Sequence, residues 1–507
     1  MIEFSATEIA AVTGGRLSEA AQKEPTLVVS SAATDSRESR PGGLFIAKPG
    51  ETTDGHNFVA AAFANGAVLA LAERAVADDD GTDLPAVVVP DAVEAMGKLA
   101  AETVRRLREH SPLTVIGITG SAGKTTTKDV LAQLLGAEGP TVAPIGSYNG
   151  EIGVPLTVFS ADYGTRYLVI EMGATGAGHI DYLCSMVKPD IGVVLCVGSA
   201  HAGEFGGVER IAEAKSELPR SLGEKGLAIL NADDHRVRGM SKSTQAPVVY
   251  FSEDSTFESA DSAVVRAEEV FLSVEGNPCF TLVLPNGARH DVRPLLIGRH
   301  HVANLLAAAS AAHAAGVPGE KIAAGLCAAR AVSRWRMERT DRADGVTVIN
   351  DAYNANPESM RAALATLAEL GRGRRTWAVL GEMLELGEES VTAHDAIGRV
   401  VVRLNISKLI VVGDGARALH AGAVLEGSWG DEALFARDVS EAAEILDREL
   451  VPGDLVLVKS SNGAGLRHLG DRIALASDSS PAVPDDHPGS QGGPNGPDPK
   501  NQGGTTP

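Results

Sequence analysis

Residues 114–127, TVIGITGSAGKTTT, constrain the fold of this chain more than any other stretch. An apolar, β-branched run leads into glycines, a lysine and three threonines, which is the order of a strand, a phosphate-binding loop and a helix. In such a loop the backbone amides point at phosphate oxygens, and the helix dipole adds about half a positive charge. We expect contacts from Gly120, Ser121, Ala122, Gly123, Lys124, Thr125 and Thr126.

The side chains of this loop predict its ligand. Lys124 is placed to reach the outer phosphates of a nucleotide, and Thr125 to put its hydroxyl on Mg²⁺. The loop is shorter than the common one, because Ile118 stands where the first glycine of that pattern would be. An ordinary glycine-rich turn is the alternative, but such a turn has no need of Gly-Lys-Thr.

Length and charge limit the classes of protein. The chain has 507 residues, too many for one core, so about three domains are expected. Its net charge of −21 argues against general binding of nucleic acids or of anionic membranes. The uncharged, alanine-rich stretch 301–319 is expected to be a buried helix and not to insert into a membrane. No secretory signal is recognisable, and the four cysteines form no metal-binding pair. We therefore expect a cytoplasmic protein.

The alternation of apolar, strand-like runs with helix-like segments predicts an α/β chain of three domains and a tail. Residues 1–110 alternate short strands with helices. Residues 111–332 contain near-continuous apolar strands, typical of a parallel, doubly wound sheet, with an antiparallel excursion over residues 247–296. Residues 333–476 repeat the doubly wound pattern. Residues 477–507 have almost no aliphatic side chains and are expected to be disordered.

Polar residues stand where the middle strands are expected to end. Glu171 ends a strand near the phosphate loop, where a lone carboxylate is a natural Mg²⁺ ligand. His201 follows the next strand, and a neutral imidazole can coordinate a metal. Lys215 lies in the helix after it, Asn304 in an alanine-rich helix, and Asp351 in the segment NDAYNANP. Each of these residues also has an ordinary structural explanation when it is considered alone. Glu171 can be a solvated carboxylate, His201 a loop residue and Lys215 a surface lysine. Asn304 and Asp351 can be helix caps.

Together these motifs resemble the Mur ligase family, the ATP-dependent amino-acid and peptide ligases of cell-wall precursor synthesis. The resemblance covers about residues 25–475. It rests on the order of the loop at 120–126, EMG at 171–173, AHAGEFG at 200–206, AK at 214–215, NADD at 231–234, DAYNANPESM at 351–360 and GEMLELG at 381–387. The last two runs resemble the member that joins D-alanyl-D-alanine to UDP-N-acetylmuramoyl-tripeptide.

The resemblance implies a fold and a reaction. The N-terminal domain would bind the UDP-sugar peptide, the central P-loop domain ATP, and a Rossmann-like C-terminal domain would close over both. ATP would phosphorylate the terminal carboxylate of UDP-N-acetylmuramoyl-tripeptide, and the amine of D-alanyl-D-alanine would attack the acyl phosphate. The products would be the UDP-linked pentapeptide, ADP and phosphate, formed by a monomer.

The family resemblance also implies two Mg²⁺ sites. Lys124, Thr125 and one ion would serve the β- and γ-phosphates, and Lys124, His201 and Lys215 would be catalytic. Glu171, His201 and Lys215 fit the second ion. In the family the lysine at this position is carbamylated, which turns a cation into a carboxylate-like ligand.

Nucleotide and substrate contacts follow from the same resemblance. Asn304 fits the adenine and Asp351 the ribose, while either Arg334 or Arg336 would reach the phosphates, with Arg336 favoured. Further residues are implied to contact the other substrates: Ser36, Arg37, Asn149, Asn354 and Asn356. For the pair in the TDSR segment, a surface turn is an equal alternative. The chain departs from the family pattern at Gly150, His301 and Ser460.

Two other functions remain open from the sequence. A sibling ligase would add a single amino acid, but its Asn-Pro-Arg-type motif is not found in the C-terminal part of the chain. A nucleotide-driven switch would hydrolyse ATP to regulate a partner, but it has no need of a third α/β domain with its own asparagine-rich loop.

Overall fold

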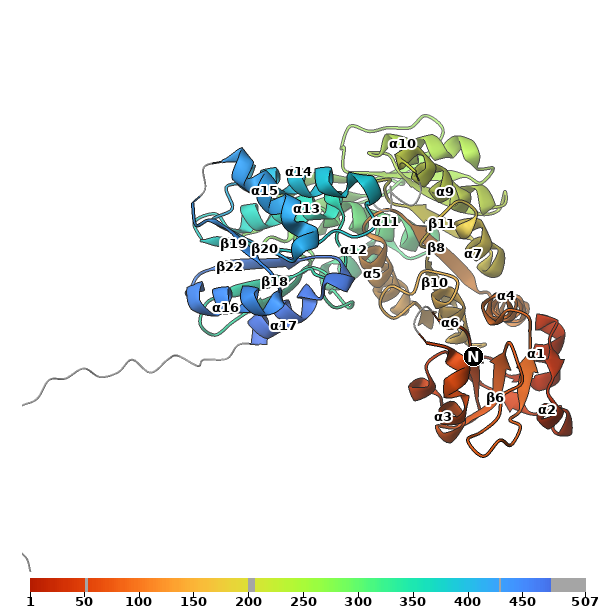
Figure 1. Cartoon of the computed structure of the whole chain (residues 1–507). Helices are drawn as coiled ribbons and strands as arrows, with labels where there is room; N and C mark the ends of the chain where they lie inside the picture. The colour runs from red at the N-terminus through yellow and green to blue at the C-terminus, as the bar shows by residue number, and fades with distance from the viewer. Residues whose placement is uncertain (51–52, 199–205, 428–429, 476–507) are drawn as a thin grey trace, which may run out of the picture.

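A computed structural model describes residues 1–50, 53–198, 206–427 and 430–475, which form three large sheets with their helices and one two-stranded sheet (Figure 1). The expected disordered tail, residues 477–507, and the candidate ligand His201 therefore lie outside the described residues. The α/β fold with parallel-rich sheets agrees with the prediction from the apolar runs. Among the described residues, no helix has both the length and the apolar character needed to cross a bilayer.

The N-terminal sheet has five strands in the order β2-β7-β6-β5-β4, with a separate β1–β3 pair. The strands are β1 Phe4–Ser5, β2 Arg16–Leu17, β3 Val28–Val29, β4 Ser31–Ala33, β5 Gly43–Ala47, β6 Ala67–Ala72 and β7 Ala86–Val88. The helices are α1 Ala6–Thr13, α2 Glu19–Lys23, α3 Val59–Ala64 and α4 Ala92–His110. The strand β6 was not predicted from the sequence, because the run AVLALA continues the alanine-rich pattern of α3.

The middle sheet has nine strands in the order β16-β15-β14-β13-β12-β11-β8-β10-β9. They are β8 Thr114–Thr119, β9 Thr141–Val142, β10 Tyr167–Glu171, β11 Ile191–Val194, β12 Leu227–Asn231, β13 Val248–Ser252, β14 Ala263–Leu272, β15 Pro278–Val283 and β16 Arg289–Val292. Strand β8 lies between β10 and β11, and all three run parallel. The carboxyl ends of these strands therefore meet at one edge of the sheet, where ligands bind in such folds.

The expected antiparallel excursion over residues 247–296 is only partly present. Strands β13 and β14 extend the parallel sheet, and the antiparallel pairs are β14–β15 and β15–β16. Burial alternates along β14, so its sequence has the pattern that an antiparallel strand shows.

Helices cover both faces of the middle sheet. They are α5 Lys124–Gly136, α6 Gly153–Phe159, α7 His179–Val187, α9 Val208–Ser221, α10 His235–Gly239, α11 His301–Ala314 and α12 Gly319–Ala328. Side chains of α5, α11 and α12 share one apolar cluster with one face of the sheet, while α6, α7 and α9 pack on the other face. Alternate residues of β8 supply both clusters, with Val115 in one and Ile116 in the other.

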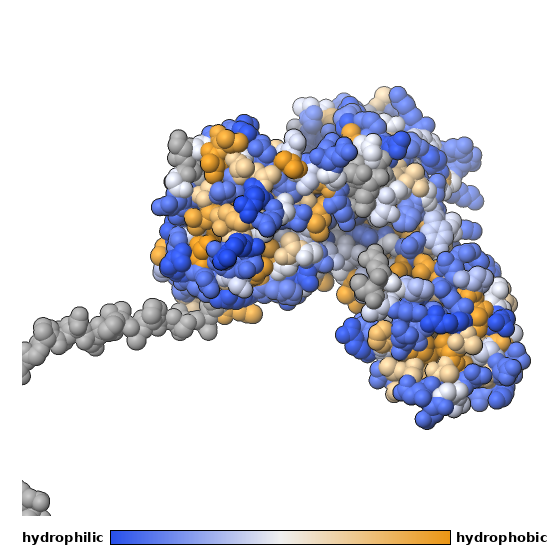
Figure 2. Space-filling model, viewed as in Figure 1, coloured by the Kyte–Doolittle hydropathy of each residue, from blue (hydrophilic) through white to orange (hydrophobic). Residues whose placement is uncertain are grey.

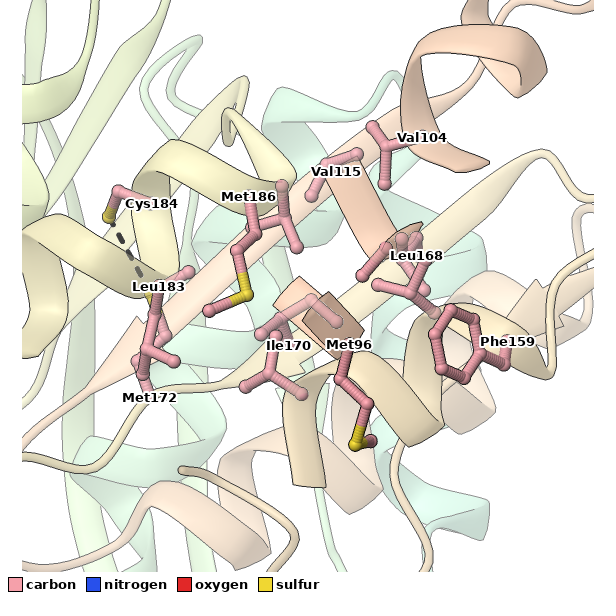
Figure 3. Close-up of a cluster of buried hydrophobic side chains, with 14 of the residues drawn as sticks. Met96, Val104, Val115, Phe159, Leu168, Ile170, Met172, Leu183, Cys184 and Met186 are labelled. Atoms are coloured by element: carbon pink, nitrogen blue, oxygen red, sulfur yellow. Dashed lines mark hydrogen bonds between the residues drawn. The ribbon is translucent and has the colours of Figure 1, made fainter. Parts of the chain in front are cut away.

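Helix α4 joins the N-terminal sheet to the middle sheet. It packs against α1 on one side and against α6 and α7 on the other. Figure 3 shows Met96 and Val104 of α4 beside Val115, Leu168 and Ile170 of the middle strands. A single buried cluster therefore runs from the N-terminal sheet into the middle sheet.

The C-terminal sheet has six strands in the order β17-β18-β22-β19-β20-β21. They are β17 Glu338–Asp341, β18 Thr347–Asn350, β19 Thr376–Leu380, β20 Lys408–Val412, β21 Ala433–Ala436 and β22 Leu455–Lys459. Its helices are α13 Pro357–Leu370, α14 Ser390–Arg403, α15 Arg417–Glu426, α16 Val439–Glu449 and α17 Leu466–Leu475. Only β17 is antiparallel, and separate apolar clusters fill the two faces. Figure 2 shows an open angle between this part and the N-terminal part of the chain.

Candidate active site

The phosphate-type loop connects β8 to α5. Gly123 caps the helix in a left-handed conformation with φ of 82°, and a Cβ there would collide with the side-chain oxygen of Asn304. A glycine is therefore needed both for the backbone angle and for the close approach of α11. The Lys124 ammonium donates to the Gly120 carbonyl at 2.7 Å. Burial lowers the pKa of Lys124, and the charge of Arg336 lowers it further, although Glu171 opposes both.

Oxygen atoms gather beside the loop at the end of β10. Ser147 Oγ donates to Glu171 Oε1 at 2.8 Å, and the Asn149 amide donates to the same oxygen at 2.9 Å. The Thr125 and Ser147 hydroxyls lie 3.2 Å apart. Glu171 is fully buried, yet its Oε2 has no hydrogen-bond partner. A buried carboxylate oxygen without a partner, next to two hydroxyls, fits a hard cation such as Mg²⁺.

This oxygen cluster differs from a preformed acidic metal site. Among the residues that the structure describes, no group of three His, Cys, Asp or Glu side chains is arranged to hold a metal ion. Lys215 lines the same cavity and is almost fully buried. Burial and the charge of Lys124 lower the pKa of Lys215 to about 7. A large fraction of this amine is therefore neutral near neutral pH, which is the form that reacts as a nucleophile.

Asn304 lies against the loop from the other side. Its amide is 3.2 Å from Nδ1 of His301, whose Nε2 is buried without a partner. His300 packs on His301 with ring centroids 4.1 Å apart. Burial lowers the pKa of both imidazoles, that of His300 to about 4, so both rings are neutral at physiological pH. Asn304 therefore borders the loop and a pair of neutral histidines.

The C-terminal sheet contributes the opposite wall. Asp351 follows β18, and its carboxylate accepts from the Lys459 ammonium at 2.6 Å and from the Met337 backbone amide at 3.0 Å. Lys459 also donates to the Asn354 carbonyl at 2.9 Å. Asn356 caps α13, and its side-chain amide reaches the Ser121 carbonyl of the loop at 3.4 Å. The asparagine-rich segment therefore contacts the phosphate-type loop directly.

The two candidate arginines point to different places. Arg334 bonds Asp471 at 2.8 Å and stacks over Trp335, and its side chain is exposed. Arg336 lies over the Tyr353 ring at 4.4 Å and donates to the Thr125 hydroxyl at 3.3 Å. The structure thus places Arg336 beside the loop and Arg334 away from it.

Apart from Arg334 and its partners Trp335 and Asp471, these groups line one cavity of about 530 Å³ between the middle and C-terminal sheets. The predicted residues that it brings together are Gly120, Ser121, Ala122, Gly123, Lys124, Thr125, Thr126, Asn149, Glu171, Lys215, Asn304, Arg336, Asp351, Asn354 and Asn356. A cavity of this volume accommodates a nucleotide-sized ligand.

Sequence profiles of one family match most of the chain. The Mur ligase family catalytic domain matches residues 28–104, the Mur ligase middle domain residues 118–312, and the Mur ligase glutamate ligase domain residues 335–462. A curated relative from Mycobacterium tuberculosis, the UDP-N-acetylmuramoyl-tripeptide–D-alanyl-D-alanine ligase, is 44% identical over 93% of this chain and 98% of its own length. This chain is a Mur ligase.

Solved structures of similar proteins agree with this family. MurF from Acinetobacter baumannii has a TM-score of 0.81 and 31% identity to this Mur ligase, covering 94% of it and 99% of the other chain. The MurF ligase of Thermotoga maritima in complex with ADP has a TM-score of 0.71 and 27% identity, covering 88% and 97% of the two chains. The family and the fold expected from the sequence motifs are therefore confirmed.

Two predicted residues of this Mur ligase lie elsewhere. Ser36 begins a short 3-10 helix, Ser36–Glu38, in the N-terminal part, and its carbonyl accepts from Asn65 at 3.0 Å. Arg37 is exposed and pairs with Asp35 at 2.5 Å. Neither residue lines the cavity.

Many residues that line the cavity were not predicted as site residues, among them three that contact predicted side chains. Ser147 bonds Glu171, Tyr353 lies beneath Arg336, and Lys459 pairs with Asp351. Lys459 had a usable signal, since it ends the apolar strand β22 at the ligand-binding edge of a parallel sheet. Ser147 and Tyr353 lie in loops, and the sequence gives no partner for them.

Proposed function

We propose that this Mur ligase joins D-alanyl-D-alanine to UDP-N-acetylmuramoyl-tripeptide at the expense of ATP. The observation that supports the proposal most directly is the single cavity that holds a phosphate-type loop, a buried carboxylate oxygen without a partner and Arg336. These are the groups needed to bring a nucleotide phosphate to a second anion. The name of the mycobacterial relative identifies the two substrates to be joined.

In this proposal the parts of the chain divide the binding of substrates. Residues 1–110 bind the UDP-sugar peptide, with Ser36 and Arg37 at its uridine diphosphate end. Residues 111–332 bind ATP, and residues 333–476 bind D-alanyl-D-alanine. The position of the cavity between the middle and C-terminal sheets supports this division. One chain supplies both walls, so we propose a monomer working in the cytoplasm, where its UDP-linked substrate and ATP occur together.

The first step brings two anions together. A carboxylate oxygen of the tripeptide attacks the γ-phosphorus of ATP, and the bond from that phosphorus to the ADP oxygen breaks. Lys124 and Arg336 place positive charge where the anions meet, which lowers the repulsion that otherwise raises the barrier. Asn304 and Asp351 hold the adenine and the ribose. The products of this step are an acyl phosphate and ADP.

The second step forms the peptide bond. The amine nitrogen of D-alanyl-D-alanine attacks the acyl carbon, and the bond from that carbon to the phosphate oxygen breaks. The proton that the amine gives up leaves with the phosphate. Asn354 and Asn356 lie on the C-terminal wall next to the loop, where they can position the acceptor. Asn149 is placed on the opposite side, beside Glu171, to contact the peptide of the other substrate. Inorganic phosphate leaves with the pentapeptide product.

We also propose two Mg²⁺ sites. Thr125 belongs to the first, beside the β- and γ-phosphates, and Glu171, Lys215 and His201 to the second, His201 being outside the described residues. The unpartnered Glu171 Oε2 supports the second site, and so does a Lys215 amine that is partly neutral and able to form a carbamate. Ions bound by these residues would neutralise phosphate charge and orient the phosphates. Ser147 keeps the Glu171 carboxylate in place through its hydrogen bond.

A phosphate-release assay tests this proposal. We expect turnover only when ATP, UDP-N-acetylmuramoyl-tripeptide and D-alanyl-D-alanine are all present, and loss of turnover in Lys124→Ala because positive charge leaves the phosphate site. Turnover with a single amino acid and none with the dipeptide would instead identify a sibling ligase. ATP hydrolysis unaffected by either substrate would identify a regulatory ATPase.

A further inference from the structure

A segment without regular structure connects the middle sheet to the C-terminal sheet and delivers Arg336. We call residues 329–337, which join α12 to β17, the strap. The strap lies along α5, the helix that begins at the phosphate-type loop. Its last part carries Arg336 to the Thr125 hydroxyl at 3.3 Å. The position of this arginine therefore depends on how the strap is attached.

Three residues of α5 hold the strap at regular intervals. The Gln133 side chain donates to the Arg330 carbonyl at 3.0 Å and accepts from the Arg330 amide at 3.1 Å. Asp129 accepts from the Ser333 backbone amide at 2.9 Å. Positions 125, 129 and 133 are four residues apart and so share one face of the helix. The strap thus follows a single stripe of α5 toward the loop.

The residue in the middle of this stripe, Asp129, is a buried carboxylate. Asp129 is almost fully buried and forms an ion pair with Lys128, whose ammonium also donates to the Pro144 carbonyl at 2.9 Å. The void remaining between α5 and the strap measures about 10 Å³, about the room of one water probe. The strap therefore packs directly on the helix.

Backbone strain surrounds Arg336. Trp335 has φ of 59° and Met337 φ of 51°, both in the left-handed region that non-glycine residues rarely adopt. Their amides are held by Glu338 at 2.9 Å and by Asp351 at 3.0 Å. Such conformations persist only where the surrounding contacts enforce them. The two residues fix the direction in which the arginine leaves the strap.

We propose that Gln133 and Asp129 are positioning residues for Arg336, which tie the strap to α5 and so set the arginine against the phosphate end of the nucleotide. The proposal rests on the proposed function, because it assumes that Arg336 acts on the phosphates. In this proposal α5 has two roles. It begins at the phosphate-type loop, and it also positions the Arg336 guanidinium, which belongs to the strap. Loss of a tie lets Arg336 move away while leaving the loop intact.

Kinetics of variants in the full-length protein test the positioning. Gln133→Ala and Asp129→Ala are expected to lower kcat about tenfold, since a displaced cation stabilises the transition state less, with KM for ATP within about twofold because the loop is unchanged. Gln133→Glu keeps the acceptor for the Arg330 amide and should recover part of kcat. In an Arg336→Ala background, neither alanine substitution should lower kcat by more than about twofold further.

A matched control and a second measurement keep the outcomes apart. Lys321→Ala removes an ion pair to Glu138, just beyond the same helix, without touching the strap, and should leave kcat unchanged in both backgrounds. Hydrogen exchange should show lost protection at the amides of Arg330 in Gln133→Ala and of Ser333 in Asp129→Ala. Given an active wild-type protein, two results would contradict the positioning role. One is that Gln133→Ala or Asp129→Ala lowers kcat by the same factor with and without Arg336→Ala. The other is that hydrogen-exchange protection is lost while kcat is unchanged. A wild-type protein without substrate-dependent turnover would refute the proposed function instead.

Discussion

At the scale of single residues, the protonation of Lys215 decides what the cavity can bind. A charged ammonium beside Lys124 would repel a metal ion, whereas a neutral amine can react with CO₂ to give an anionic carbamate. The pKa of about 7 means that the neutral fraction grows as the pH rises through that value. An unperturbed lysine, with a pKa of about 10.4, would stay protonated throughout this range.

Carbon-13 NMR of protein equilibrated with labelled bicarbonate can detect this carbamate. We expect a carbamate signal that increases between pH 6 and pH 8, with an apparent midpoint at about 7, following deprotonation of the amine. Lys215→Ala should lack the signal, and Lys225→Ala, which removes an exposed lysine, should keep it. A signal equally strong in Lys215→Ala would show that another amine reacts.

At the scale of elements, the junction between the loop and α5 depends on one glycine. Gly123 combines a φ of 82° with a contact to Asn304 that leaves no room for a Cβ. Any side chain there either strains the backbone or pushes α11 away from the loop. The loop and Asn304 therefore hold their positions together.

Gly123→Ala should weaken ATP binding at least about tenfold, or about 1.4 kcal/mol, because the loop or Asn304 must shift. Isothermal titration calorimetry measures this change. Gly136→Ala is the matched control on the same helix, since its Cβ would meet nothing within 4 Å, and it should leave the affinity unchanged. Equal affinity in the two variants would contradict the tight contact at Gly123.

The sequence predicted some elements well for physical reasons. Near-continuous apolar strands were expected in both doubly wound parts, and β10 and β19 are such strands, because strands inside a parallel sheet are buried on both faces and need no alternation. Strand β21, Ala433–Ala436, was not predicted, because four residues at a sheet edge carry little pattern. The sequence also left two arginines open as candidates. Their difference arises from the left-handed residues Trp335 and Met337, and the sequence gives no sign of that conformation.

At the scale of the whole molecule, the three sheets do not form three independent cores. Helix α4 packs on one face of the middle sheet (Figure 3). The same apolar cluster continues into the N-terminal sheet. The C-terminal sheet keeps its own clusters. We therefore expect the first two sheets to unfold together and the third to unfold separately.

Met96→Ala should lower the free energy of unfolding of the joint unit by about 2–5 kcal/mol, because it leaves a cavity in the shared cluster. Met360→Ala, in a cluster of the C-terminal sheet, is the matched control and should lower only the other transition. Calorimetry with proteolytic mapping of each transition separates the two. A separate N-terminal transition in Met96→Ala would show that α4 does not couple the sheets.

The four-residue spacing along α5 limits how this chain can change in length. One residue inserted between Thr125 and Gln133 would turn the far end of the helix by about 100° and move it by about 1.5 Å. Gln133 would then face away from Arg330, while the loop would keep its direction. Substitution of one of these side chains removes a single contact, whereas a change in the number of residues between them disrupts several contacts at once. Insertions and deletions should therefore be rarer within α5 and the strap than in the surface loops of related chains.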